Sequence, residues 1–387
     1  MQTADKRAVI WGAGHIGRGF VAQILREGGY MIDFVDRDAA LIEELNARKA
    51  YTVVRATPEG IAKARVEGGF TASHTSDADA LTEMFEREDL LVDIAVFKND
   101  LESVADMLAP LLIHRAERLP KSAADFLMNV NMTRPDEAFR ALMRARLDGE
   151  ALRYFEERVG VSGIFAMCIS PTTPQEYLDE DPLALYNNDY PEQAVSRPAF
   201  KGPLPQAPRL RLSDDLEAEE TRKLYTLNMA HCALAYLGAP RGFHTAYEAV
   251  QDAGIRKRVD QALQEASLGL SGEFGFSSEE MAAWRKTIFS LLDNPYIADG
   301  LDRLGADSRR KLSANDRLVM PARLCLKHGG EPRALAEILR AGYAFDNPDA
   351  GTQFVQALVR EEGLPRAVET VSGLDRESAL YQLIFNV

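Results

Sequence analysis

Apolar residues in the first half of the chain fall into short blocks separated by turn residues and helical segments. Residues 7–11, 31–36, 90–96 and 124–132 form four such blocks. Buried parallel strands carry continuous apolar runs of this length, because helices cover both faces of their sheet. The pattern therefore predicts an α/β unit with a Rossmann-like parallel sheet.

In the second half, from about residue 214 onward, apolar residues recur at three- and four-residue steps. This spacing places them on one face of a helix. The pattern predicts helices over residues 218–237, 245–270, 278–292 and 332–343. Ser277 to Glu280 has the composition of a helix start, while Gly238-Ala239-Pro240 and Gly329-Gly330 have that of helix stops. We expect this half to be almost entirely α-helical.

The change of periodicity divides the chain into two predicted domains, residues 1–200 and residues 201–387. A chain of 387 residues is too long for one ordinary core, and 46% hydrophobic residues are enough to fill two. Between about Ser170 and Pro208 the sequence is rich in Pro, Asn, Asp and Tyr, which disfavours regular helix. We interpret this stretch as an irregular crossing between domains with one or two short strands.

Composition limits the kinds of partner that the chain is expected to bind and the compartment in which we expect it. The formal net charge of −14 opposes binding to a nucleic-acid backbone. No apolar run approaches the ~20 residues of a membrane span, and the chain starts without a signal-peptide core. The cysteines, Cys168, Cys232 and Cys325, lack ligand-like spacing, which argues against disulfides or zinc. We expect a cytoplasmic protein without a nucleic-acid or membrane partner.

A glycine-rich segment joins the first apolar block to a helical pattern. Gly12, Gly14 and Gly17 surround His15 and Ile16 in this segment. A dinucleotide pyrophosphate requires backbone N–H groups at close range and the positive end of a helix. We expect Gly12 to allow the turn, Gly14 to allow the approach of the phosphate, and Gly17 to pack helix against strand. These five residues are candidate cofactor-binding residues.

An acidic residue ends the second apolar block, 24 positions after Gly12. A carboxylate at Asp36 accepts both ribose hydroxyls of a dinucleotide and repels a 2′-phosphate. This predicts NAD as the cofactor, while the adjacent Arg37 leaves NADP as an alternative. Arg18 has three interpretations of equal weight: contact with the pyrophosphate, contact with the substrate, or a surface cap.

Ligands of open α/β sheets bind beyond the carboxyl ends of the strands. Asn131 follows the fourth apolar block and is a candidate for the substrate side, with a turn-forming role as the alternative. Phe97, Lys98 and Asn99 follow the third block and are candidates for the nicotinamide side.

Three polar residues stand close together in the helix predicted over residues 218–237. At ~100° per residue, the offsets of Lys223, Asn228 and His231 place them within an arc of ~140° on one helix. Alcohol oxidation without a metal requires a base, and a lysine serves when burial lowers its pKa. Asn228 and Asn131 can donate N–H groups to the developing alkoxide, and His231 can bind the same oxygen. The alternative for each residue alone is a solvated or core polar side chain.

A cluster of basic residues lies farther along the chain. It consists of Arg303, Arg309, Arg310, Lys311 and Arg317. Such a cluster binds an anionic small substrate, or it forms a solvated basic face. The six histidines form no close ligand pair, and no serine-hydrolase elbow or phosphate-binding Gly-Lys-Thr loop is present. We therefore expect no metal, and neither serine hydrolysis nor ATP-driven phosphoryl transfer.

Several segments resemble the long-chain polyol dehydrogenase family, which includes the mannitol dehydrogenases. The residues that carry the likeness are 12–20, 201–205, 222–231, 236–238, 293–296 and 309–318, in the same order as in the family. The resemblance is strongest between about Lys201 and Gly329. It implies an N-terminal Rossmann domain, a helical C-terminal domain, catalysis without a metal, and a monomer or weak homo-oligomer.

The resemblance also implies roles for individual residues. Lys223 is the catalytic lysine, Asn228 and His231 complete the lysine-asparagine-histidine motif, and Asn131 takes the place of the asparagine after an inner strand. Arg303 and Lys311 match basic residues that face the substrate in relatives. The candidate substrate-binding set is Arg303, Arg309, Arg310 and Lys311.

The short chain is similar to the sugar-phosphate members of the family. We therefore expect NAD-dependent interconversion of D-mannitol 1-phosphate and D-fructose 6-phosphate. Two departures from the family pattern, Val130 and the segment Phe165-Ala166-Met167, leave alternatives open. These are a dehydrogenase of another polyol or keto-uronate, and a catalytically silent NAD-binding protein.

Overall fold

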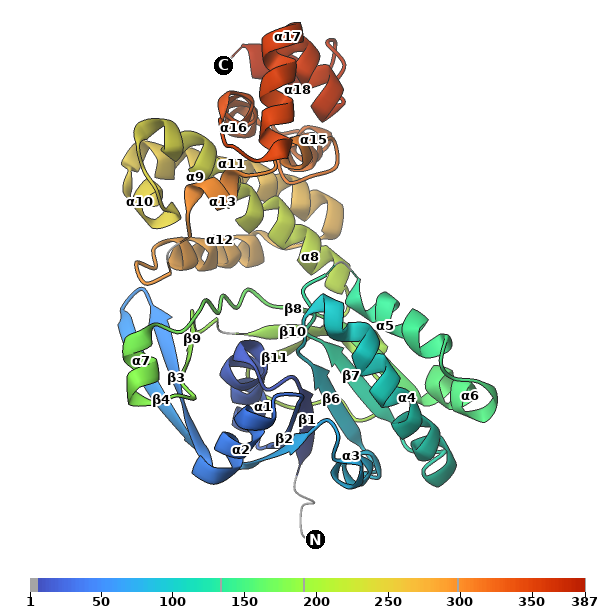
Figure 1. Ribbon diagram of the computed structural model, residues 1–387. Helices are drawn as coiled ribbons and strands as arrows, with labels where there is room; N and C mark the ends of the chain where they lie inside the picture. Colours follow the sequence, from blue (N-terminus) through green and yellow to red (C-terminus); the bar gives the residue numbers. More distant parts are fainter. Residues whose placement is uncertain (1–5, 133, 191, 298, 387) are drawn as a thin grey trace. The chain divides into compact units, whose positions relative to one another are not determined.

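The chain forms two compact units, Met1–Leu216 and Glu217–Val387. The structure is a computed structural model that describes residues 6–132, 134–190, 192–297 and 299–386 (Figure 1). The sequence predicted a boundary between residues 200 and 201. Strand β11 (Leu210–Ser213) pairs with β10 (Gln193–Ser196), so the stretch after residue 200 still contributes to the sheet of the first unit.

Within the described residues, eight strands form the main sheet of the first unit. Their spatial order is β11, β10, β8 (Val159–Phe165), β7 (Ala124–Met128), β6 (Leu90–Ile94), β1 (Arg7–Trp11), β2 (Met31–Asp36) and β5 (Phe70–His74). The pairs are parallel except for β10 against β8. The predicted Rossmann-like sheet is confirmed, and β1 and β2 have the predicted bounds.

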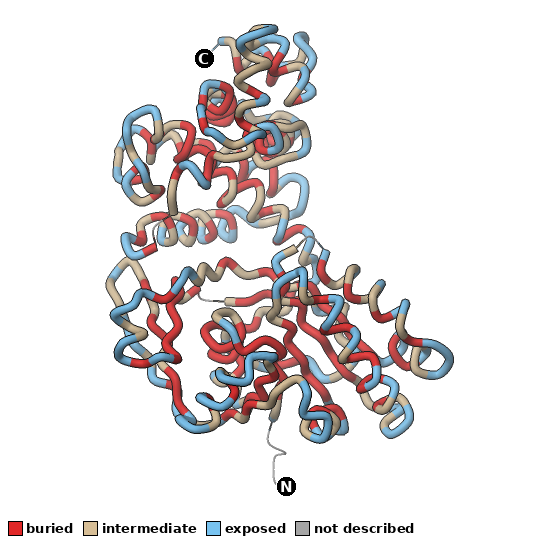
Figure 2. Tube along the Cα trace, viewed as in Figure 1, coloured by how far each residue is buried: buried red, intermediate tan, exposed pale blue. Residues whose placement is uncertain are grey.

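Helices cover the sheet because its strands are apolar on both faces. The helical elements of the first unit are η1 (Gly17–Val21), α1 (Ala22–Glu27), α2 (Ala39–Arg48), α3 (Ala78–Phe85), η2 (Lys98–Asp100), α4 (Leu101–Arg118), α5 (Pro135–Arg144), α6 (Gly149–Arg158), α7 (Gln175–Glu180) and η3 (Arg197–Ala199). A large apolar cluster joins β1, β6, β7 and β8 to α3, α4, α5 and α6. Figure 2 shows the strands of the sheet as mostly buried.

The stretch from 170 to 208 differs from its prediction in two ways. It contains a short helix, α7, where helix was not expected. Its two short strands do not cross between domains: β10 joins the main sheet, and β9 (Leu185–Asn187) joins a second sheet with β3 (Ala50–Thr57) and β4 (Gly60–Glu67). The stretch therefore contributes strands to both sheets of the first unit rather than forming an interdomain linker.

A carboxyl group is buried inside the main sheet at Asp93 of β6. Its Oδ2 accepts a hydrogen bond from Asn129 Nδ2 at 2.6 Å, and the Gln193 side chain also interacts with this carboxyl. Burial raises the pKa of Asp93 to about 7, and the bond from Asn129 opposes this rise. A raised carboxyl pKa means that the folded state loses stability as the pH rises from the ordinary value toward 7.

We therefore expect Asp93→Asn to stabilise the protein at pH 8 by about 2–4 kcal/mol, because the amide keeps an acceptor for Asn129 and carries no charge. At pH 4, where the native carboxyl is already neutral, the gain disappears. Urea unfolding at the two pH values measures both quantities. Asp79→Asn, at an exposed position of α3, is the control. An equal change in the free energy of unfolding at both pH values would contradict a raised pKa for the Asp93 carboxyl.

The second unit consists of helices in its described part. They are α8 (Leu216–Tyr225), α9 (Leu227–Gly238), η4 (Ala239–Arg241), α10 (Ala246–Gln251), α11 (Ala253–Phe274), α12 (Ser278–Leu292), α13 (Leu301–Gly305), α14 (Ser308–Lys311), α15 (Val319–Lys327), α16 (Arg333–Ala344), α17 (Ala350–Ser372) and α18 (Ala379–Phe385). The predicted all-α fold is confirmed. Helix α12 has the predicted bounds and starts with a capping box between Ser277 and Glu280.

The prediction of one helix over residues 218–237 is wrong. Helix α8 ends at Tyr225, α9 begins at Leu227, and Thr226 between them has φ −123° and ψ −75°. The helix predicted over residues 245–270 is likewise two helices, α10 and α11, which meet at Asp252. Helical periodicity continues across both breaks, so periodicity alone does not reveal them.

Helix α9 forms the centre of the second unit. It contacts α10, α11, α13 and α16. Nine of its twelve residues are buried, and Asn228, His231 and Leu237 are the half-buried exceptions.

Among the described residues, no helix is both long and apolar enough to cross a membrane.

Candidate functional site

The glycine turn after β1 has the backbone that the sequence predicted. Gly12 has φ +104°, and its N–H donates to Val35 O at 2.8 Å. A Cβ atom at Gly12 would lie 2.2 Å from Ala95 O, so both conformation and space require glycine. The strand order β6, β1, β2 places this turn at a switch point of the sheet, where α/β proteins bind dinucleotides.

The other two glycines have different surroundings. A Cβ at Gly17 would lie 2.0 Å from Gly12 O, so Gly17 allows the helix to pack onto the turn. Gly14 is exposed, and a Cβ there would meet no described atom within 4 Å. The backbone near Gly14 is therefore open to a phosphate, while His15 and Ile16 beside it are half-buried.

Asp36 lies beside the same turn. Its Oδ2 accepts from the Ala13 N–H at 2.7 Å, and its Oδ1 accepts from the Asp38 N–H at 2.9 Å. Each carboxylate oxygen has a further lone pair for a hydroxyl donor. The open backbone at Gly14 and the half-buried carboxylate of Asp36 fit the pyrophosphate and the ribose of a dinucleotide.

Burial excludes a surface cap for Arg18, and its contact with the pyrophosphate or with the substrate stays a prediction. Its side chain is buried at 5% exposure. It donates from Nε to Ala13 O and from Nη1 to Leu183 O at 3.0 Å, and its guanidinium lies over the Tyr51 ring. Arg18 therefore ties the glycine turn to the segments that carry the second sheet, and burial lowers its pKa to about 10.

The polar residues after β6 and β7 lie at the carboxyl end of the sheet. Strand β7 ends at Met128 and not at the predicted residue 132, so Asn131 is an exposed loop residue. Lys98 and Asn99 are exposed, and Phe97 is 81% exposed. An aromatic side chain with this exposure at the ligand-binding end of a sheet is available to cover a bound ring.

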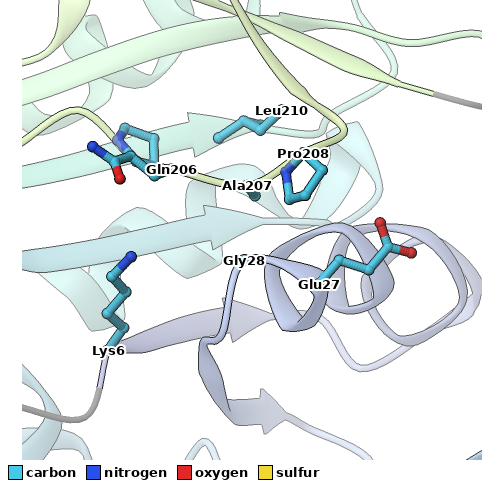
Figure 3. A pocket seen from close by; sticks show the side chains of 8 residues that line it. Lys6, Glu27, Gly28, Gln206, Ala207, Pro208 and Leu210 are labelled. Carbon is cyan, nitrogen blue, oxygen red and sulfur yellow. The ribbon is translucent and has the colours of Figure 1, made fainter.

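Two hollows in the first unit lie at the opposite end of β1. One, of about 490 Å³, is lined by Lys6, Glu27, Gly28 and residues 205–208 and 210 (Figure 3). A larger one, of about 720 Å³, includes Lys6 and Arg7 in its lining. Because Lys6 precedes β1, both hollows are at the amino end of this strand and not beside the glycine turn. We assign neither of them to the cofactor.

In the second unit, Lys223 stands in the last turn of α8 and is half-buried. Burial lowers the pKa of the Lys223 amine, and the charge of Glu220 one turn earlier opposes this. A lysine with a lowered pKa releases its proton more readily than an exposed lysine, as a general base requires.

Asn228 and His231 lie three positions apart on α9 and therefore on one side of that helix. Neither the Asn228 amide nor the His231 ring has a hydrogen-bond partner in the described part of the chain. Burial lowers the pKa of His231 to about 4, with Asp299 raising it and Arg303, Lys223 and Arg317 lowering it. His231 is therefore neutral at pH 7 and offers one ring N–H and one acceptor nitrogen.

The break between α8 and α9 is fixed by side chains. The Thr226 hydroxyl donates to Arg222 O and accepts from Trp284 Nε1 at 2.8 Å. The Arg222 guanidinium lies 4.2 Å from the centre of the Trp284 ring, and it pairs with Glu219. These contacts anchor the end of α8 to α12 and set the position of Lys223 on one side of the break.

We expect Thr226→Val to destabilise the protein by about 1–3 kcal/mol, because it removes the buried acceptor of the Trp284 N–H without changing side-chain size. The midpoint of urea unfolding measures this loss. Thr287→Val is the matched control, since the Thr287 hydroxyl also donates to a carbonyl four residues earlier but lies at a half-buried position on α12. Equal effects of the two variants would show that the Thr226 hydroxyl has no special role.

The four predicted substrate-binding cations have different partners in the structure. Lys311 is buried, and its Nζ donates to Leu304 O at 2.6 Å. The Arg309 guanidinium lies 4.2 Å from the centre of the Phe354 ring, and Arg310 pairs with Asp307 and Asp316. Among these four cations, Arg303 lowers the pKa of His231. Arg317, which is outside the predicted set, lowers it as well.

The site also includes residues that sequence reasoning missed. Asp299 pairs with Arg303, and Asp316 pairs with Arg317 through Nε at 2.6 Å. The four-residue spacing of Asp299 and Arg303 is a signal that an ion pair was available. Among the described residues, no group of three or more His, Cys, Asp or Glu side chains is placed to hold a metal ion.

Comparison with known protein families shows which family the chain belongs to. The mannitol dehydrogenase Rossmann domain matches residues 6–209, and the mannitol dehydrogenase C-terminal domain matches residues 215–376. The chain belongs to the mannitol dehydrogenase family. The two matched domains correspond to the α/β unit and the helical unit described above.

Two solved structures share the fold of this mannitol dehydrogenase family member. A D-sorbitol dehydrogenase in substrate-free form is 15% identical with a TM-score of 0.80, covering 98% of this chain and 91% of that chain. Mannitol 2-dehydrogenase of Pseudomonas fluorescens, in a ternary complex with NAD and D-mannitol, is 16% identical with a TM-score of 0.62, covering 99% of this chain and 94% of that chain.

The family assignment settles the general class of the protein. It is an oxidoreductase of polyol metabolism, with NAD as its cofactor. The glycine turn and Asp36 are the residues of this chain that fit NAD, as described above. NAD supplies the hydride acceptor for oxidation, so the protein must supply the base and the groups that orient the substrate.

Proposed function

We propose that the protein interconverts D-mannitol 1-phosphate and D-fructose 6-phosphate with NAD, without a metal. The observation that carries this proposal is the set of charges around His231. Lys223, with its lowered pKa, and the cations Arg303 and Arg317 all act on one neutral, half-buried imidazole. This set combines a base with cations that suit an anionic substrate.

Lys223 is the general acid/base of the proposed reaction. In the oxidation direction its neutral amine takes the hydroxyl proton while the hydride leaves the same carbon for NAD. In the reduction direction the ammonium group returns a proton to the carbonyl oxygen. Because burial lowers its pKa, a larger fraction of Lys223 is neutral near pH 7 than of an exposed lysine.

Asn228 and His231 orient the reacting oxygen in this proposal. Neither side chain has a hydrogen-bond partner among the described residues, so their N–H groups are available to a substrate hydroxyl or alkoxide. Asn131, at the carboxyl end of the sheet, stays a proposed N–H donor to the substrate.

For the phosphate we propose Arg303 and Arg317, rather than the buried Lys311. Arginine binds phosphate through a planar fork of N–H donors. The side chain of Arg303 is 71% exposed, so it can exchange its partner Asp299 for a phosphate at small cost.

A dehydrogenase of a free polyol is the second candidate, and one observation favours it. Both arginines are already paired with carboxylates, Asp299 and Asp316, which accept sugar hydroxyls and repel a phosphate. The D-sorbitol dehydrogenase and mannitol 2-dehydrogenase that share the fold are named for such substrates. Substrate preference therefore depends on which attraction is stronger: that of the two arginines for a phosphate, or that of the two carboxylates for sugar hydroxyls.

An assay of NADH consumption separates the candidates. Fructose 6-phosphate, fructose and keto-uronates are offered at equal concentrations, and kcat/KM is measured for each. We expect fructose 6-phosphate to be preferred by at least about 100-fold, because two charge-assisted contacts contribute to its binding. Activity on a free ketose or a uronate alone would reject the phosphate assignment. NADH binding without turnover of any ketose would indicate a catalytically silent protein.

A further inference from the structure

An ion pair crosses the carboxyl end of the Rossmann sheet. Arg37 follows β2, Asp100 ends η2 after β6, and Arg37 Nη1 lies 2.6 Å from Asp100 Oδ1. The sheet order is β6, β1, β2, so the pair joins the loops on either side of β1. The pair therefore reaches across the end of β1, the strand that leads into the glycine turn, and its Arg37 is next to Asp36 in the chain.

Asp100 stands where η2 meets α4. It is the N-cap residue of α4, a helix of 18 residues, yet its side chain makes no capping hydrogen bond. Aspartate is a preferred N-cap because its carboxylate accepts from the first N–H groups of a helix. Here the backbone of Asp100 is already helical and continues from η2, and its carboxylate binds the Arg37 guanidinium instead of capping α4.

The backbone of Arg37 is also fixed. Its carbonyl oxygen lies 2.9 Å from His74 Nε2, a hydrogen bond from the ring at the end of β5. The neighbouring Asp36 is held by the N–H groups of Ala13 and Asp38. Arg37 thus reaches toward Asp100 from a backbone anchored on both sides.

This geometry bears on the choice between NAD and NADP. NADP carries a 2′-phosphate on the adenosine ribose, and an arginine near the acidic residue after the second strand accommodates it in NADP-binding Rossmann domains. Arg37 is the residue of this chain that stands in that place. Its guanidinium is occupied by Asp100, whose negative charge also opposes a phosphate.

We propose that Asp100 is a second determinant of NAD preference, acting through Arg37 in addition to the direct effect of Asp36. The proposal rests on the NAD site at the glycine turn, and it goes beyond the proposed reaction because it concerns the nucleotide alone. With Asp100 neutral, Arg37 becomes available to a 2′-phosphate. NADH has a neutral 2′-hydroxyl at that position instead of a phosphate, so its affinity depends much less on the charges of the pair.

The test measures dissociation constants of NADH and NADPH by fluorescence, without any polyol, at an ionic strength of about 0.1 M so that the charges are only partly screened. Asp36→Asn is the common background, because it removes the direct repulsion of the 2′-phosphate. We expect Asp36→Asn/Asp100→Asn to bind NADPH about 10-fold more tightly than the background, as one charge-assisted contact provides. NADH affinity should change less than about 3-fold on the same scale.

Two controls make the result specific. Adding Arg37→Ala to the double variant should erase the gain for NADPH. Replacing Asp106 by asparagine instead of Asp100 removes another exposed carboxylate of α4, one that pairs with Arg146, and should give no gain. An unchanged NADPH affinity, a gain that survives Arg37→Ala, or an equal gain with Asp106→Asn would overturn the proposal. Failure of the unaltered protein to bind NADH would instead overturn the cofactor site itself.

Discussion

Lys223→Ala should lower kcat for the polyol and ketose reactions by about 10³-fold or more, within the range for loss of a general acid/base. The variant removes the amine that we propose exchanges a proton with the substrate oxygen. Asn228 and His231 remain to orient this oxygen, so binding of substrate should change much less than turnover. Steady-state kinetics in both directions, at fixed pH, measures the two effects separately.

The controls for this variant separate chemistry from structure. Lys327→Ala removes another lysine of the helical unit, one that is exposed and pairs with Glu273, and should leave kcat unchanged. NADH affinity should remain normal in Lys223→Ala, because the cofactor residues belong to the other unit. Near-normal turnover of Lys223→Ala would show that the base is misassigned.

Arg303→Ala combined with Arg317→Ala should lower the selectivity for fructose 6-phosphate over fructose by about 100-fold, since each lost charge-assisted contact is worth roughly a factor of ten. The physical reason is that only the phosphorylated ketose carries the charge that these arginines bind. The ratio of the two kcat/KM values cancels changes in folding or in the base.

Arg309→Ala is the matched control for that pair. Its guanidinium lies on the Phe354 ring, so we expect a change in selectivity below about 3-fold, the level of a lost surface contact. Loss of selectivity in Arg309→Ala, with none in the Arg303 and Arg317 double variant, would move the phosphate site to α14. A drop in both kcat/KM values by the same factor would favour a free polyol as substrate.

The features that the sequence predicted well are those fixed by local chemistry. The bounds of β1 and β2 follow from apolar runs that end at a glycine turn and an acidic residue. Gly12 and Gly17 occupy positions where a Cβ atom would clash, which is why these positions need glycine. Helix α12 starts at a capping box that involves residues only three apart.

The features that the sequence did not predict depend on distant residues. The break at Thr226 is held by Trp284, 58 residues later, and the helical periodicity of α8 and α9 continues across it. Lys311 stands in a run of basic residues but is buried, with its amine on the Leu304 carbonyl. Neither a tertiary hydrogen bond nor the burial of one lysine among exposed arginines is encoded in local spacing.

The same reasoning applies to the proposed catalytic set. Lys223, Asn228 and His231 were identified on the assumption of one helix, and the structure divides them between α8 and α9. Lys223 still lies near enough to His231 to lower its pKa. Their proximity therefore depends on the Thr226 break and its contacts with α12, and not on helical spacing.

The pH dependence of kcat/KM for polyol oxidation tests the role of Lys223 most directly. Only the neutral amine accepts a proton, so the rate should rise with pH and level off above the pKa of Lys223, which burial places below the ordinary value of 10.5. Ketose reduction should fall over the same range, because it needs the ammonium form. We predict that this inflection is present in the unaltered protein and absent in Lys223→Ala. The same inflection in both proteins would contradict Lys223 as the general acid/base.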